Sequence, residues 1–208
     1  MTPEQIEAMF TRSDGLYAFA RWGRPIAPVV FGVDDATLGV VKGAVEAVAR
    51  LAGHDVVETD PELGANLMFF FVRDWAELAA LPGLERMIPD LGPLLERLEA
   101  QAANQYRIFR FDAAGAIRAC FVFLRMDAAL AEMPADTLAL GQVVQSMLLW
   151  SEAAFRTRSP LAVLPESGAV ILRPEIAGLI RAAYDPVMPA AAQDASHALR
   201  LAARMGRE

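Results

Sequence analysis

The sequence predicts a single α/β (α+β) domain in which a mixed sheet of about five strands is packed by long helices. Apolar strand-like runs alternate along the chain with amphipathic helical stretches, which is typical of this fold class. Hydrophobic residues make up 55% of the 208 residues, enough apolar side chain for a packed core. No repeat, low-complexity linker or charge block divides the chain. We therefore expect one domain over residues 1–208, with residues 1–20 as a candidate N-terminal helical extension.

The first half of the chain is predicted to contain three strands and three helices. The expected strands are 26–31, 54–58 and 66–72, and the last is continuously apolar, as in a strand buried on both faces. The expected helices are 3–13, capped by Thr2 with Pro3 in the first turn, 34–52, capped by Asp34 or Asp35 and closed by Gly53, and 74–81.

The second half is predicted to contain a hairpin surrounded by helices. Two aromatic-rich runs, 106–111 and 117–125, flank a four-residue loop that ends in Gly115, which is a strong hairpin signal. The expected helices are 91–103, 138–155 with Asp136 as its cap, 174–184 and 190–205.

The helix at 138–155 carries a family resemblance. Its sequence LALGQVVQSMLLWSEAAF, with Tyr184-Asp185-Pro186 further on, resembles the catalytic half of a family of uncharacterised bacterial zincin-like proteins inferred to be metallopeptidases. The order of three other segments is similar to that family too. These segments are Arg24-Pro25-Ile26 before a strand and Gly32, Ala65-Asn66-Leu67 opening an apolar strand, and Pro174-Glu175 opening a helix. The resemblance covers about two thirds of the chain in order and spacing and implies a zincin-like fold.

The same resemblance argues against zinc chemistry on this helix. A zinc-peptidase helix needs two histidines one turn apart and a glutamate beside the first as general base. The matching ligand positions are Leu140 and Val144, and the base position is Gly141. None of these residues binds zinc or transfers a proton. We therefore expect no catalytic residue, no metal and no cofactor here, as in a pseudoenzyme.

A helical wheel divides this segment into an apolar face and a polar face. Leu140, Val143, Val144, Met147 and Trp150 fall together and predict core packing. The polar side carries the residues expected to face a remaining binding cleft. These candidate cleft residues are Gln142, Gln145 and Glu152, joined by Tyr184 from the C-terminal motif.

Two other kinds of function stay open. His54 and His197 lie far apart in the sequence but could meet in space, so a metal-dependent hydrolase with rearranged ligands is the alternative. Arg107, Phe109 and Phe111 share one face of the hairpin at 106–125, where aromatic and arginine side chains could stack nucleic-acid bases. The usual role of such a pattern is a phenylalanine core with a solvated arginine rim, and a net charge of −7 disfavours nucleic acid.

The favoured prediction is a non-catalytic domain that binds a protein or a small ligand, or has a structural role. Trp22, Trp75 and Trp150 could line a groove, and a homo-oligomer is compatible with the high apolar content. No apolar run approaches the ~20 residues that span a membrane, and the first residues do not form a signal peptide. With Cys120 as the single cysteine, the expected compartment is the cytoplasm, or an extracytoplasmic one if a signal was removed.

Overall fold

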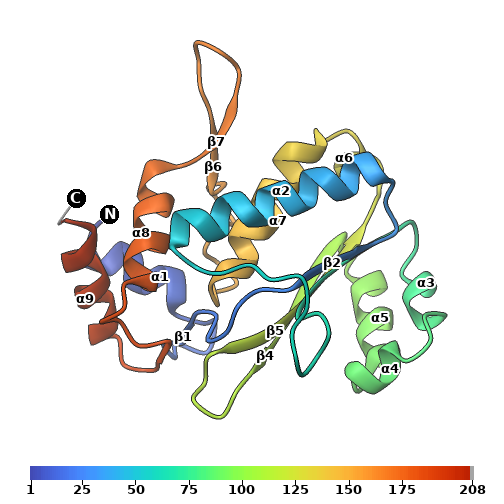
Figure 1. The fold of residues 1–208 in the computed structure, drawn as a ribbon, viewed down its shortest axis with the longest axis horizontal. Coiled ribbons are helices and arrows are strands. Elements are labelled where there is room, and N and C mark those ends of the chain that lie inside the picture. The colour runs from blue at the N-terminus through green and yellow to red at the C-terminus, as the bar shows by residue number, and fades with distance from the viewer. Residues whose placement is uncertain (207–208) are drawn as a thin grey trace.

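A four-stranded mixed sheet lies at the centre of the molecule (Figure 1). The structure, a computed structural model, describes residues 1–206. In spatial order the strands are β2 (Pro28–Phe31), β3 (Leu67–Val72), β5 (Ile117–Arg125) and β4 (Gln105–Phe111). The first three run parallel, and β4 runs antiparallel to β5. The fold is therefore the predicted mixed α/β class, with β2 and β4 as the two edges of the sheet.

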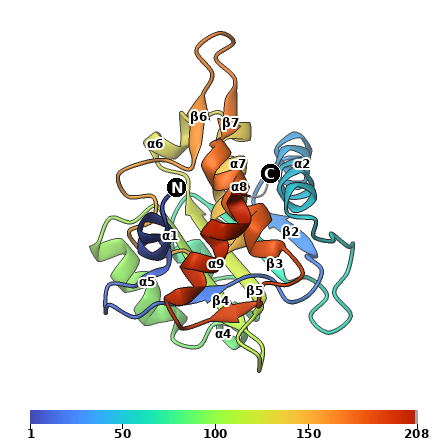
Figure 2. The same ribbon diagram turned by 90° about the vertical axis from the view of Figure 1, so that its left-hand side faces the viewer.

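Helices cover both faces of this sheet (Figures 1 and 2). One face is packed by α2 (Asp35–Ala52), α7 (Ala135–Met147) and α8 (Pro174–Tyr184), with α1 (Pro3–Phe10) and α9 (Ser196–Met205) in the same hydrophobic cluster. The other face is packed by α3 (Ala76–Ala79), α4 (Leu84–Met87) and α5 (Leu91–Ala100). Because successive side chains of a strand point to opposite faces, Phe69 joins the first cluster and Phe70 the second. Every residue of β3 is buried, as the apolar run 66–72 predicted.

The remaining elements are short. A short helix, α6 (Ala128–Ala131), follows β5, and β1 (Phe19–Ala20) pairs with β8 (Ala191–Ala192). β6 (Leu161–Val163) and β7 (Val170–Leu172) form a hairpin that projects from the body of the molecule (Figures 1 and 2). Within residues 1–206, no helix is both long and apolar enough to cross a membrane.

Several helix ends lie where the capping residues of the sequence predicted them. Thr2 caps α1 in a complete capping box, with Pro3 in the first turn. Asp34 caps α2 by accepting a hydrogen bond from the Thr37 N–H at 2.7 Å, and Gly53 ends that helix in the left-handed conformation. The candidate extension at 1–20 contributes Ile6 and Phe10 to the hydrophobic core, so α1 is packed into the fold.

The strand predicted at 54–58 is wrong, and the sheet has four strands instead of about five. The segment makes a single bridge, between Ile26 and Val56, and no ladder. Its side chains at Asp55, Val57 and Glu58 are exposed, so there is little apolar burial to stabilise a longer pairing. The segment instead runs beside β2 as an irregular loop.

The helix predicted over 138–155 is also wrong at both ends. Pro134, not Asp136, takes the N-cap position, and Asp136 lies within the first turn. The helix ends at Met147 because Leu148 is extended and bridges to Arg21. Four other predicted helices are shorter than expected. They are 3–13, 74–81, 91–103 and 190–205, observed as 3–10, 76–79, 91–100 and 196–205.

Candidate functional site

Helix α7 carries the positions where the zincin-like resemblance would put zinc ligands and a general base. Val144 is fully buried, and Leu140 packs half-buried against the same hydrophobic cluster. A Cβ atom at Gly141 would meet Leu161 of β6 at 3.7 Å. Among residues 1–206, no group of three His, Cys, Asp or Glu side chains could hold a metal ion. The matched positions therefore belong to the packing of the helix.

The two histidines lie in separate surroundings. His54 Nε2 is 2.8 Å from the Arg24 carbonyl oxygen, and its ring centroid is 5.1 Å from that of Tyr184. His197 Nδ1 is 2.9 Å from Tyr17 Oη, and burial lowers the pKa of His197 to about 4. Both rings are thus held by groups of the fold itself, and burial lowers the pKa of His54 as well.

A cleft of about 840 Å³ lies between the edge strand β4 and the segment 145–156. Aromatic side chains make up much of its wall: Tyr106, Phe109, Phe111, Trp150 and Phe155. Its charged residues are Arg12, Arg107, Arg156 and Glu152. Aromatic walls with convergent polar groups are a common composition of a ligand site. The arginines also make it locally cationic in a chain of net charge −7.

The far wall of this cleft forms where α7 stops. The Leu149 N–H donates to the Ala20 carbonyl at 2.9 Å, which keeps the chain extended after the helix. Trp150 then folds back, donating from Nε1 to the Val144 carbonyl at 3.1 Å. Its ring stacks on Phe10 with centroids 5.3 Å apart and meets Phe155 edge-on at 4.9 Å. These contacts within the chain hold the aromatic wall in place.

A chain of polar side chains links β4, beside the cleft, to α7. Arg107 of β4 donates from Nη2 to Gln142 Oε1 at 2.6 Å, and Gln142 Nε2 donates to Gln105 Oε1 at 2.8 Å. Arg107 is half-buried, and its Nε is enclosed with no hydrogen-bond partner. Burial lowers the pKa of Arg107 to about 10, so the guanidinium stays charged at neutral pH. Gln142, a predicted cleft residue, is buried, bonds to two residues of β4 and lines the hollow next to the cleft.

Gln145 and Glu152 line the cleft. Gln145 Nε2 donates to the Gly141 carbonyl at 3.1 Å, one turn back along α7. Glu152 accepts a hydrogen bond from the Ser13 N–H at 3.2 Å, and it sits on the irregular segment instead of on the helix. Its carboxylate is therefore held by the N-terminal region and not by Arg107.

Tyr184 lies elsewhere, underneath the end of α7. Its hydroxyl donates to the Met147 carbonyl at 2.9 Å and accepts from the Trp22 N–H at 3.4 Å. The Arg21 guanidinium lies 5.4 Å from the ring centroid. Burial raises the pKa of Tyr184 well above its ordinary value. Tyr184 thus fixes the helix terminus and does not line the cleft.

A smaller hollow of about 320 Å³ adjoins the cleft and shares Gln105 and Gln145 with it. Its other walls are largely apolar and come from α6, α7 and the β6–β7 hairpin: Leu130, Met133, Leu138, Leu161, Val163 and Val170. The polar chain from Arg107 through Gln142 to Gln105 thus lies between an aromatic cleft and an apolar hollow.

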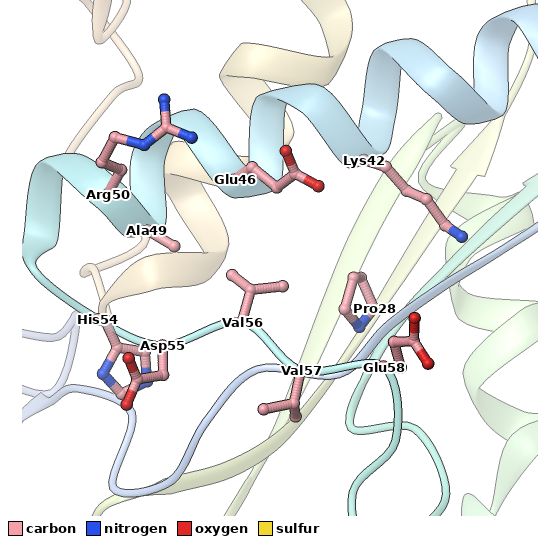
Figure 3. Close-up of a pocket in the computed structure, with 10 residues that line it drawn as sticks. All are labelled: Pro28, Lys42, Glu46, Ala49, Arg50, His54, Asp55, Val56, Val57 and Glu58. Carbon is pink, nitrogen blue, oxygen red and sulfur yellow. The ribbon is translucent and has the colours of Figure 1, made fainter.

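A separate groove of about 690 Å³ runs between α2 and the segment 54–58. Its charged side chains have both signs: Lys42, Glu46 and Arg50 come from α2, and Asp55 and Glu58 from the segment (Figure 3). All five are exposed. The cleft at β4 is the stronger candidate, because it adds the half-buried Arg107 and an aromatic wall to its exposed charges.

Sequence reasoning missed the central polar residue of the cleft. Arg107 was expected on the solvated rim of the hairpin, yet it is half-buried beside α7. The available signal was its position, because Arg107 and Phe109 share the face that packs on α7. Of the three tryptophans, Trp150 lines the cleft, whereas Trp22 and Trp75 are core residues.

Comparison with known proteins adds no family assignment. No family model, no curated protein and no solved structure matches the chain. The zincin-like resemblance accordingly stays a prediction from short motifs, while the mixed α/β class follows from the observed topology.

Proposed function

We propose that this protein is a non-catalytic binding domain that takes an extended peptide segment into the cleft along β4. The observation that carries the proposal is the position of the cleft against an edge strand. An edge strand has unpaired N–H and C=O groups on its outer side, and peptides bind such edges by adding a strand. β4 has seven residues, five of which line the cleft.

The other edge of the sheet is less suited to this role. β2 has only four residues, and the segment before it is bridged to Val56 of the neighbouring loop. β4 also faces the preformed wall of Trp150 and Phe155, which offers pockets for the side chains of a peptide. Main-chain pairing and aromatic pockets together favour a peptide over a compact small molecule.

The proposal is tested by peptide selection and a pair of phenylalanine variants. A library of random dodecapeptides is panned against the full chain, and the enriched peptide is synthesised and titrated by fluorescence anisotropy. F155A removes part of the cleft wall, whereas F31A makes the same change at an exposed residue of β2. We expect F155A to weaken binding by about tenfold or more and F31A to leave it unchanged. Equal affinity for both variants would place the binding site outside the cleft.

A metal-dependent hydrolase with rearranged ligands is the alternative function. The apolar residues at the ligand positions of α7 argue against it, as does the separation of His54 and His197 into different surroundings. We expect dialysed protein to contain substoichiometric zinc and to show no rise in Tm when zinc is added. Stoichiometric retained zinc with a large rise in Tm would support the hydrolase instead.

A further inference from the structure

We propose that the cleft recognises a carboxylate of the bound peptide, which pairs with Arg107 between two apolar subsites. This inference rests on the proposed function, since it specifies which peptides the cleft takes. The ligand class is an acidic peptide that carries its carboxylate beside apolar or aromatic side chains.

The charge of Arg107 is unbalanced within the fold. None of the ion pairs among residues 1–206 involves Arg107, and its only hydrogen-bond partner is the neutral amide of Gln142. Its neighbour Cys120 is buried, and burial raises the pKa of that thiol to about 12, so Cys120 supplies no negative charge at neutral pH. A half-buried charge without a counter-ion is costly, and an anionic ligand supplies the missing partner.

The surrounding wall of the cleft is charged as well. Arg156 and Arg12 also line the cleft, together with the carboxylate of Glu152, and Arg12 is paired with Asp14 at 3.6 Å. Glu152 is hydrogen-bonded to the Ser13 N–H, so it does not neutralise Arg107. A cationic cleft in an acidic protein raises the local concentration of anions and disfavours basic peptides.

Arg107 lies between two apolar surfaces. The guanidinium lies beside the Gln142–Gln105 chain, with the aromatic cleft on one side and the apolar hollow at Leu138 and Leu161 on the other. An extended peptide has side chains that alternate between its two sides. A carboxylate at Arg107 therefore leaves neighbouring side chains to fill the two apolar surfaces. A guanidinium fits a carboxylate well because it presents planar N–H donors.

The test compares charged and neutral forms of one peptide. The peptide enriched by panning is synthesised as selected, with each Asp or Glu replaced by Asn or Gln, and with an amidated C-terminus. The amidated form separates a C-terminal carboxylate from a side-chain carboxylate. Each form is titrated against the wild type, R107M and R110M. R110M is the matched control, because Arg110 lies three residues along β4 on the opposite face of the strand.

We expect neutralising one carboxylate to weaken binding to the wild type by about tenfold or more. The same neutralisation should have little effect on R107M, and R110M should behave like the wild type. The Arg107 Nε–Hε signal in a ¹⁵N NMR spectrum should shift with the acidic peptide and not with its neutral form, a readout that a merely structural arginine would not give.

Two results would overturn the inference. The first leaves the proposed function standing, and the second overturns it as well. If F155A weakens binding but neutral and acidic peptides bind equally well, carboxylate recognition is wrong and the peptide cleft stands. If no peptide is enriched, or if binding ignores F155A, the proposed function fails and the inference fails with it. If R107M does not fold, the inference is still tested, because the neutral and acidic peptides are compared on the wild type.

Discussion

The half-buried charge of Arg107 has no counter-ion within the fold, and this lowers the stability of the folded chain. The proposed role of Arg107 in binding a carboxylate accounts for such a residue. Replacing it with methionine removes the unpaired charge and keeps an unbranched side chain of similar length. The change also leaves the buried Gln142 Oε1 without its donor, so we expect the free energy of unfolding of R107M in urea to stay within about 1 kcal/mol of that of the wild type. R110M should change it by less than about 0.5 kcal/mol. A clear loss of stability in R107M would mean that the bond from Arg107 to Gln142 mainly holds α7 against β4.

His197 makes stability depend on pH. Its pKa is lowered to about 4 in the folded chain by burial and by the charge of Arg200, whereas an unfolded histidine has its ordinary pKa near 6.5. The unfolded state therefore binds the proton first as the pH falls. The stabilisation is complete above about pH 6.5 and is lost as the pH falls to about 4, a change on the order of 3 kcal/mol.

The variant H197N isolates this contribution, because asparagine does not titrate. We expect wild-type urea unfolding to weaken steeply between pH 6.5 and 4.5, and H197N to show a shallower slope there. His54 remains in both proteins and its pKa is also lowered, so some slope should persist. Identical slopes would show that His197 is not neutral in the fold.

At the scale of elements, the end of α7 depends on Tyr184. Y184F removes the hydroxyl that bonds both the Met147 carbonyl and the Trp22 N–H. Because both partners are buried, we expect a loss of about 1–2 kcal/mol in the free energy of unfolding. Y106F makes the same change at a less buried hydroxyl and should cost much less. Binding of the selected peptide should survive in Y184F, since Tyr184 does not line the cleft.

Helices α2 and α7 show which helix ends a sequence can predict. The ends of α2 were predictable because Asp34 and Gly53 act on neighbouring residues. The end of α7 was not, because its apolar periodicity continues past Met147 while Leu148 pairs with the distant Arg21. The cleft shows the same difference between local and long-range signals. The helical pattern selected Gln142, Gln145 and Glu152 as candidates, but it could not pair Gln142 with Arg107, which lies 35 residues away on another element.

At the scale of the whole molecule, the candidate binding residues lie along one edge of the sheet, at β4. Helix α7 ends beside β4, and the segment that follows it forms the aromatic wall of the cleft. The opposite edge is short and lies beside the loop 54–58, whose groove has exposed charges of both signs. The fold thus offers one long strand edge together with a preformed, cationic and aromatic cleft.

Hydrogen–deuterium exchange of the full chain, with and without the selected peptide, tests this account most directly. A peptide that adds to the sheet should slow exchange in β4, residues 105–111, and in the facing segment 150–156. The groove between α2 and the segment 54–58 should be unaffected. Protection confined to that groove, or peptide binding with no protection in β4, would contradict the proposal that the cleft along β4 is the binding site.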